Sequence, residues 1–264
     1  MPSMKKRSYV IESKTFLTDE IVSMWIIADD IAKCAVPGQF VSIYCDSKSE
    51  LLPRPISICD TDADKGLLRI VFRIAGRGTK EFAAKDKGDK LDIIGPLGNG
   101  YLDAIVSSNI NADSKAIIIG GGIGIPPMLK LAKELKCNKS VVLGYRDFIY
   151  MNDEFAPYGD VFVSTEDGSV GTKGNVIDAI KNNGIEADVL FACGPIPMLR
   201  GLKQYADENG MTAWISLEEK MACGIGACLA CVCNSTEIDS HSMVKNKRIC
   251  KDGPIFNAKE VDFS

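Results

Sequence analysis

The stretch AIIIGGGIGIPPMLKLAKEL, residues 116–135, joins an apolar run to a glycine-rich turn and then to an amphipathic segment. The apolar residues 116–119 predict a buried strand, and Pro126 and Pro127 are typical of the first positions of a helix. Further apolar runs predict strands at 140–145, 161–164 and 188–192, with helical stretches between some of them. Strands and helices that alternate in this way indicate a parallel α/β sheet from about residue 115 onward.

The glycine turn at 120–124 indicates a binding site for a pyrophosphate. Glycines let the backbone approach such an anion, and the helix that follows directs its positive N-terminal end toward it. A glycine triplet alone is often only a tight turn, but here it follows a buried strand, as in dinucleotide-binding domains. The run that begins at Gly122 continues into proline where the usual G-x-G-x-x-G motif has its last glycine. This departure points away from an ordinary Rossmann dehydrogenase.

The first hundred residues have a different pattern. Short β-rich segments lie at 9–12, 21–27, 39–44 and 67–74, separated by polar residues, glycine or proline. Several short strands in succession favour a β-barrel. The change to the α/β pattern places a domain boundary near residues 103–114.

Four cysteines near the C-terminus have the spacing C-x4-C-x2-C-x18-C. They are Cys223, Cys228, Cys231 and Cys250. This is the plant-type ligand pattern of a [2Fe-2S] cluster. Gly224 and Gly226 can adopt the positive φ angles that a tight ligand loop requires.

A structural zinc site or a pair of disulfides is the alternative, since the C-x2-C part of this pattern fits either. Zinc sites usually take their thiolates from two C-x2-C knuckles, and here the second half contains only Cys250. Cys233 lies two residues beyond Cys231 and would point to the other side of an extended segment. We therefore expect Cys233 to be a neighbour of the cluster rather than a ligand.

Composition limits the function classes. The chain has 264 residues, 46% of them hydrophobic, and a net charge of −4, which does not indicate nucleic-acid binding. The basic start at residues 5–7 leads into a strand pattern rather than the apolar region of a signal peptide, and no run is long enough for a membrane span. Ten cysteines without a secretion signal indicate a reducing compartment, so we expect a cytoplasmic protein. The single histidine, His241, is expected to be a solvated loop residue.

Several short motifs follow one another along the chain. They are P-G-Q-F at 37–40, R-P-I-S at 54–57, G-x-G-T at 76–79, G-P-L-G-N-G at 95–100, G-G-G-I-G at 120–124 and C-G-P at 193–195. In this order they resemble the ferredoxin reductase superfamily. The cysteine segment, at 218–231 and 250–256, is similar to that of the electron-transfer subunits of NAD-dependent (class 1B) dihydroorotate dehydrogenases.

This resemblance implies an α+β multidomain chain. Residues 1–108 would form an FAD-binding antiparallel β-barrel, residues 109–212 an NAD-binding parallel, Rossmann-like α/β domain, and residues 213–264 a small [2Fe-2S] subdomain. The FAD contacts that it implies are Arg54, Pro55, Ile56, Ser57, Val71, Phe72, Arg73, Gly78 and Thr79. The NAD contacts are Gly121, Gly122, Gly124, Cys193 and Gly194, and the cluster ligands are Cys223, Cys228, Cys231 and Cys250.

The implied activity is a redox relay. NAD exchanges a hydride and the cluster accepts one electron, so FAD, which does both, must stand between them. The relay needs no catalytic acid or base in this chain, and we expect dihydroorotate to be oxidised on a separate FMN-containing subunit, in a heterotetramer of two plus two chains. NAD is favoured over NADP because Glu166 and Asp167 are acidic, although Arg146 precedes them.

Two other function classes stay open. One is a reductase of the same superfamily that acts alone or in electron bifurcation, on ferredoxin or sulfide. The other is a nucleotide-binding module whose cysteines hold a structural zinc ion.

Overall fold

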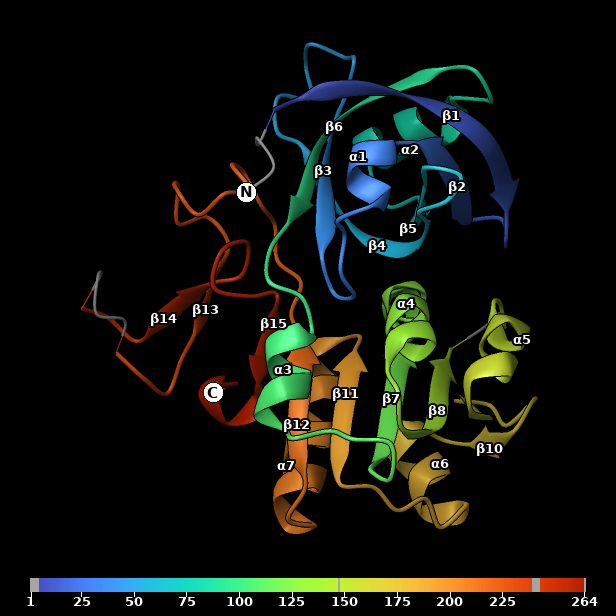
Figure 1. Ribbon diagram of the computed structural model, residues 1–264, viewed down its shortest axis with the longest axis vertical. Coiled ribbons are helices and arrows are strands. Elements are labelled where there is room, and N and C mark those ends of the chain that lie inside the picture. Colours follow the sequence, from blue (N-terminus) through green and yellow to red (C-terminus); the bar gives the residue numbers. More distant parts are fainter. Residues whose placement is uncertain (1–4, 147, 239–242, 264) are drawn as a thin grey trace.

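The computed structural model describes residues 5–146, 148–238 and 243–263. A closed β-barrel stands above an open parallel sheet, and a C-terminal segment lies along one side of both (Figure 1). The predicted combination of antiparallel barrel, parallel α/β domain and small C-terminal unit is confirmed.

The barrel closes in the strand order β1-β2-β5-β4-β3-β6, with every neighbouring pair antiparallel. Closure leaves no unpaired sheet edge. The strands are β1 (Arg7–Phe16), β2 (Ile21–Ile27), β3 (Phe40–Tyr44), β4 (Arg54–Asp62), β5 (Leu67–Arg73) and β6 (Lys90–Leu97), and the helices are α1 (Asp29–Ala32) and α2 (Arg77–Ala84). Alternate residues such as Val41 and Ile43 are fully buried in the barrel core.

The second sheet has the order β10-β9-β8-β7-β11-β12-β15, in which only β15 is antiparallel to its neighbour. Its strands are β7 (Lys115–Gly121), β8 (Asn138–Tyr145), β9 (Asp160–Thr165), β10 (Thr172–Lys173), β11 (Val189–Cys193), β12 (Thr212–Ser216) and β15 (Ile255–Asn257). The other elements are α3 (Leu102–Ser107), η1 (Gly122–Gly124), α4 (Pro126–Glu134), α5 (Asn152–Phe155), η2 (Ala156–Tyr158), α6 (Val176–Asn182), α7 (Ile196–Glu208) and η3 (Ala258–Glu260).

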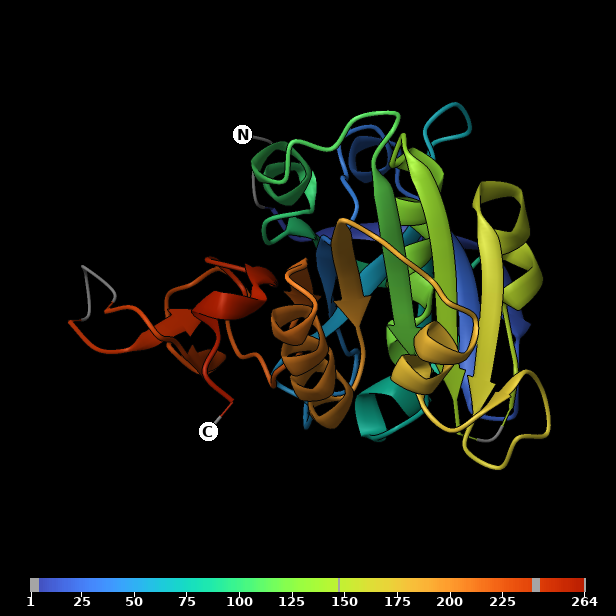
Figure 2. The ribbon, with the colours of Figure 1, turned by 90° about the horizontal axis from the view of Figure 1, so that it is seen from below.

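After the exposed Lys115, the central strand β7 is apolar and buried, as expected for a strand whose sheet has helices on both faces (Figure 2). Ile118 packs with α4 residues, whereas Ile117 and Ile119 pack with residues of α6 and α7. Strands β8, β9 and β10 follow one another outward on one side of β7, whereas β11 and β12 lie on the other side. Ligands of open α/β sheets bind at such a switch point, beyond the carboxyl ends of the strands.

The C-terminal segment is attached to both larger parts. Its hairpin, β13 (Val232–Asn234) and β14 (Asn246–Arg248), stands apart, but β15 pairs with β12. The backbone N–H of Asn99 donates to the carbonyl of Gly253 at 2.7 Å. We keep the boundaries near residues 108 and 212 as a proposal, with β12 and β15 linking the second and third parts. Within the described residues, no helix is both long and apolar enough to cross a membrane.

Charged side chains connect the barrel to the α/β sheet. The guanidinium of Arg69 in β5 donates to both carboxylate oxygens of Glu154 in α5, and its Nε donates to Ser23 Oγ at 3.0 Å. The Arg69 side chain is 9% exposed and that of Glu154 is 37% exposed. Lys133 of α4 donates to Asp60 of β4 at 2.6 Å. These contacts hold the two parts in one orientation.

We expect Glu154→Ala to lower the free energy of unfolding by about 1–3 kcal/mol, because it leaves the Arg69 charge buried without its partner. In a chain of this size 1 kcal/mol corresponds to roughly 2–4 °C in melting temperature, which calorimetry of the purified protein measures. Glu12→Ala removes an ion pair between Glu12, whose side chain is 42% exposed, and Lys87, whose side chain is 69% exposed. It should lower the free energy of unfolding by about 0.5 kcal/mol or less. Equal losses in the two variants would contradict a special role for the Arg69 pair.

Candidate functional site

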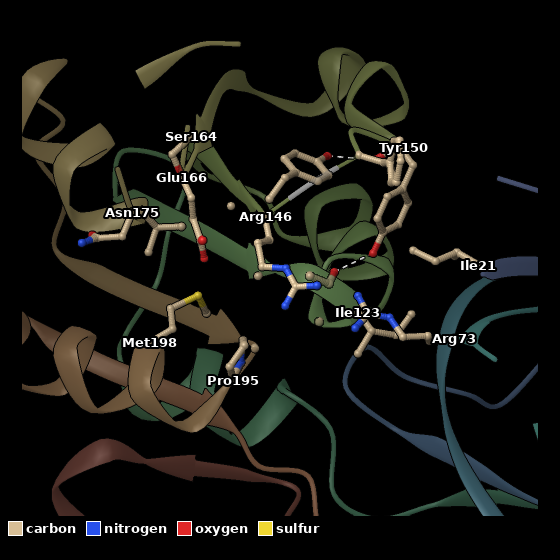
Figure 3. Close-up of a pocket in the computed structure, with 18 of the residues that line it drawn as sticks. Ile21, Arg73, Ile123, Arg146, Tyr150, Ser164, Glu166, Asn175, Pro195 and Met198 are labelled. Atoms are coloured by element: carbon tan, nitrogen blue, oxygen red, sulfur yellow. Dashed lines mark hydrogen bonds between the residues drawn. The ribbon is translucent and has the colours of Figure 1, made fainter. Parts of the chain in front are cut away.

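A pocket of about 810 Å³ lies at the carboxyl ends of β7, β8 and β11, and the turn between β1 and β2 of the barrel faces it (Figure 3). Four of the predicted NAD contacts line it, namely Gly121, Gly122, Gly124 and Gly194. Arg73, predicted as an FAD contact, lines it as well. The structure therefore brings these residues together at the topological switch point of the sheet.

The glycines of the turn have different roles. A Cβ atom at Gly124 would lie 2.4 Å from the carbonyl oxygen of Cys193, and one at Gly121 would lie 2.5 Å from Sδ of Met198. These two positions are glycine because other parts of the chain pack against them. Gly122 has a φ of +53° and faces open space, where the nearest atom to a Cβ would be Nη2 of Arg73 at 4.0 Å. The backbone at Gly122 is thus the part of the turn that a ligand can approach.

Tyr150 fixes the position of this turn. Its hydroxyl donates to the carbonyl of Gly122 at 2.6 Å, and the hydroxyl of Tyr145 donates to the carbonyl of Tyr150 at 2.8 Å (Figure 3). Burial raises the pKa of both phenols well above the usual range, so they stay protonated donors. Neither tyrosine belongs to a motif, and only the fold places them beside the glycine turn.

Polar side chains from the ends of β8 and β9 occupy the far end of the pocket. Arg146 and Glu166 extend into it, and Ser164 lies next to Glu166 (Figure 3). Ser164 is 1% exposed, and its Oγ has no hydrogen-bond partner among the described residues. Asn175 also lines the pocket, but its side-chain oxygen caps α6 by accepting from the N–H of Ile177 at 2.8 Å.

Cys193 is the last residue of β11, one residue beyond the predicted end of the strand, and Gly194 follows it; the two differ in exposure. Cys193 is fully buried, which raises the pKa of its thiol well above the usual range, whereas Gly194 lines the pocket. An un-ionised, inaccessible thiol cannot act as a nucleophile. The thiol is part of the apolar core, and the backbone of Cys193 packs against Gly124.

Glu218 lines the same pocket and was outside the predicted contacts. Its side chain is exposed because it faces the open space of the pocket, yet protein surrounds it on the other sides, and this desolvation raises its pKa. The pKa of Glu218 is therefore raised because many protein atoms surround the carboxyl, although the side chain keeps contact with solvent in the pocket. No described residue pairs with its carboxyl in an ion pair or hydrogen bond.

The predicted FAD contacts lie on the barrel. Arg54, Pro55, Ile56 and Ser57 begin β4, Val71, Phe72 and Arg73 end β5, and Gly78 and Thr79 lie in the first turn of α2. A Cβ at Gly78 would lie 2.7 Å from Nε of Arg54, so the structure brings these two together. The first turn of α2 presents backbone N–H groups that no intrahelical carbonyl satisfies, a suitable cradle for a pyrophosphate.

Several of these side chains have other contacts. The guanidinium of Arg54 pairs with the carboxylate of Glu50, and the hydroxyl of Thr79 accepts the N–H of Ala75 at 2.9 Å. The Phe72 ring is 1% exposed and packs edge to face on Phe82. The Phe72 side chain is thus part of the barrel core. The FAD role of these residues stays a prediction.

The four C-terminal cysteines form two pairs. The thiol of Cys228 lies close enough to that of Cys223 to affect the pKa of Cys223, and the same holds for Cys231 and the pKa of Cys250. The backbone N–H of Cys250 also donates to Sγ of Cys231 at 3.4 Å. Cys231 and Cys250 are buried, Cys223 is half-buried and Cys228 is exposed. A two-iron cluster takes two thiolates at each iron, and two pairs of thiols suit that arrangement. Within the described residues, no three His, Cys, Asp or Glu side chains are grouped closely enough to hold a single metal ion.

Backbone donors point at the cysteine sulfurs. Cys223 Sγ accepts the N–H groups of Ile225 at 3.5 Å and Ala227 at 3.2 Å, and Cys250 Sγ accepts that of Gly226 at 3.0 Å. Burial alone would raise the pKa of Cys223, but these N–H groups and the Cys228 thiol outweigh it and lower the pKa to about 7. Burial raises the pKa of Cys250 to about 12, and the Cys231 thiol acts in the same direction. Such donors favour thiolates, the form that iron binds.

The ligand loop has the expected backbone. Gly224 and Gly226 have φ angles of +68° and +83°, which confirms the predicted need for glycine there. Cys233 lies in β13, and its thiol donates to the carbonyl of Lys247 at 3.5 Å. His241 lies outside the described residues.

The comparisons with known proteins agree with this arrangement. Residues 218–262 match the family model for the iron-sulfur cluster binding domain of dihydroorotate dehydrogenase B. A Fusobacterium nucleatum protein named dihydroorotate dehydrogenase B (NAD(+)), electron transfer subunit, is 40% identical over 98% of this chain and 99% of its own. The chain belongs to this family of electron-transfer subunits. A Bacillus cereus member of the same name is 39% identical over the same shares of the two chains.

Solved structures agree with the family's fold. A structure of an NADH-dependent reduced ferredoxin-NADP oxidoreductase, described in connection with flavin-based electron bifurcation, has 31% identity and a TM-score of 0.83, covering 100% of this chain and 92% of its own. A flavohemoglobin from Malassezia yamatoensis, at 21% identity and a TM-score of 0.64, covers 78% of this chain and 57% of its own. The second likeness shows the shared barrel and α/β architecture alone.

We expect Glu218→Gln to make the stability of the protein less dependent on pH. The folded protein binds the Glu218 proton more tightly than the unfolded chain does, so the wild type loses stability as the pH rises above 4.5, the ordinary value. Glutamine does not titrate. The variant should therefore have the higher melting temperature at about pH 8 and equal the wild type below about pH 4.

The matched control for this measurement is Glu219→Gln, at the exposed neighbouring position. It should follow the wild type at each pH between those limits. A difference between Glu218→Gln and the wild type that stays constant from low to high pH would contradict the titration.

Proposed function

We propose that this chain is the electron-transfer subunit of an NAD-dependent dihydroorotate dehydrogenase of pyrimidine biosynthesis. It would pass electrons from an FMN-containing catalytic subunit through a [2Fe-2S] cluster and FAD to NAD⁺. The observation that carries the proposal is that the cysteine loop and the dinucleotide pocket both adjoin the barrel that is predicted to bind FAD. The cysteine loop packs on the outer face of the barrel strand β3, and the glycine-lined pocket lies between the barrel and the parallel sheet.

The site residues fit the cofactors chemically. Two pairs of thiols with backbone donors suit the cluster, the first turn of α2 suits the FAD pyrophosphate, and the open backbone of Gly122 suits that of NAD. Bound FAD can take electrons singly from the cluster and give them in pairs to NAD⁺ as a hydride. Nothing in this proposal requires a catalytic side chain, and dihydroorotate is oxidised on the partner.

The exposed thiol of Cys228 supports entry of electrons from a separate protein, because electron exchange requires a cluster near the surface. We infer an assembly of two of these chains on a dimer of the catalytic subunit, in the cytoplasm. The similarity to the bifurcating oxidoreductase supports a second candidate function, in which the partner subunit delivers electrons from a donor other than dihydroorotate.

An absorption spectrum tests the proposal first. The chain is purified anaerobically after co-expression with a candidate catalytic subunit, and the visible spectrum is recorded before and after addition of dihydroorotate or NADH. We expect flavin bands and a cluster shoulder that NADH bleaches, and that dihydroorotate bleaches only when the partner is present.

Two results would contradict the proposal. A colourless protein with stoichiometric zinc would indicate a nucleotide-binding module with structural cysteines. A coloured protein that ignores dihydroorotate in the presence of the partner would favour a reductase of the same superfamily.

The choice between NAD and NADP generates a separate prediction. We propose that Glu166 accepts a hydroxyl of the adenosine ribose and repels a 2′-phosphate. Glu166→Gln should lower the ratio of kcat/KM for NADH over NADPH about tenfold, the order of one charge-assisted hydrogen bond. Asp167→Asn is the control, because the Asp167 carboxylate accepts the N–H of Ser169 and is outside the pocket lining. An unchanged ratio in Glu166→Gln would remove this carboxylate from cofactor selection.

A further inference from the structure

Ser42 of β3 has a buried hydroxyl without a hydrogen-bond partner among the described residues. The residue is 1% exposed. Burying a hydroxyl without a partner is unfavourable, and native proteins seldom leave one in that state without a reason. Among the described residues, only Ser42 and Ser164 have such side-chain atoms. Ser164 lines the dinucleotide pocket, which supplies the ligand that its hydroxyl can meet, whereas Ser42 lies elsewhere.

The side chain of Ser42 is on the outer face of the barrel. Its neighbours Val41 and Ile43 are fully buried in the barrel core, and successive side chains of a strand point to opposite faces. Phe40, on the same face as Ser42, packs in one apolar cluster with Cys231 and Cys250. The outer face of β3 is therefore the surface that the C-terminal cysteine segment covers.

The hydroxyl of Ser42 lies directly against the ligand loop. A Cβ atom at Gly224 would lie 2.8 Å from Oγ of Ser42 and 3.5 Å from Cδ1 of Leu97. Gly224 follows Cys223, and its φ of +68° turns the chain so that the N–H groups of Ile225 and Ala227 reach the Cys223 sulfur. The loop leaves no space for a side chain at 224, and the atom that a side chain would meet first is the Ser42 oxygen.

Across the sheet, Ser42 pairs with Pro55, which belongs to the R-P-I-S motif predicted to contact FAD. The hydroxyl therefore lies at the boundary between the cysteine loop and the strand assigned to the flavin. On the side of the cysteine loop, a Cβ at Gly224 would come within 2.8 Å of the oxygen, so the loop is packed against it.

We propose that the Ser42 hydroxyl donates a hydrogen bond to a sulfur of the [2Fe-2S] cluster, at the side of the loop that holds Cys223, and sets the reduction potential of the cluster. The inference rests on the proposed function, because it requires a cluster on the four cysteines. Reduction adds one negative charge to the cluster, and a donor to sulfur stabilises the more negative state. Ser42 is thus a positioning and tuning residue rather than a catalytic one.

The test is a redox titration of the holoprotein, with the cluster followed by electron paramagnetic resonance and the flavin by absorbance. Ser42→Ala should make reduction of the cluster about tenfold less favourable, equivalent to about 59 mV toward negative potential for a one-electron couple. The flavin potential should not change. Ser42→Thr, which keeps the hydroxyl, should stay near the wild type, and Ser164→Ala, which removes the other buried hydroxyl, should not move the cluster potential.

The possible results separate this inference from the proposed function. An unchanged cluster potential in Ser42→Ala, or a shift of the flavin potential in its place, would overturn the role given to Ser42 and leave the relay intact. A wild type without a cluster signal would overturn the relay, and this inference with it. If Ser42→Ala assembled no cluster, assembly in Ser42→Thr would support the hydroxyl as donor, and failure in both would contradict it.

Discussion

The position of the cysteine segment depends on an apolar cluster that it shares with the parallel sheet. Cys231 and Cys250 are buried in the same cluster as Ile117 and Ile119 of β7. A segment of about 50 residues is too small to bury a sufficient core of its own, so it gains stability by packing on a larger one. Because the sheet supplies that core, the cysteines occupy a fixed place relative to the dinucleotide pocket, which the same strand ends form.

The barrel is attached to this framework from the other side. Hydrogen bonds from Asn99 reach the backbone of residues 251–253, and the Arg69–Glu154 pair joins β5 to α5. The barrel therefore contacts both the cysteine segment and the sheet. A relay needs its carriers close together and in a fixed order. These polar contacts act together with an apolar core that the barrel and the sheet share, in which Ile21 and Val71 of the barrel pack with Ile118 of β7.

The sequence predicted those features that depend on local backbone chemistry. The apolar strand and glycine turn at 116–124 and the positive φ angles of Gly224 and Gly226 follow from residue type and spacing alone. The barrel and the α/β sheet were likewise recognisable, because periodicity changes near residue 115. The addition of β15 to the edge of the sheet was not predictable, since three residues after a proline carry no periodic signal.

Side-chain roles within the site were less predictable, because tertiary packing decides them. Arg73 is near the FAD motifs in sequence, but β5 ends where its guanidinium reaches Gly122 in the dinucleotide pocket. Tyr150, Glu218 and Ser164 belong to no nucleotide-binding motif, yet the fold places them all around that pocket. Tyr150 and Ser164 share a physical signal, a buried polar atom that the folded structure must explain, whereas Glu218 is marked by the desolvation that raises its pKa.

The two electron-transfer steps make different demands, and the structure meets them with different means. Hydride transfer requires the nicotinamide and flavin rings to be in contact in a defined orientation, so it depends on precise positioning. The pocket provides this through close backbone packing, such as that of Gly124 on Cys193, which leaves no room for displacement. Transfer of one electron to or from the cluster depends on potential as well as distance, and potential responds to hydrogen bonds at sulfur. The cysteine loop accordingly directs N–H groups at its sulfurs, and changes there should alter the driving force while the pocket geometry stays unchanged.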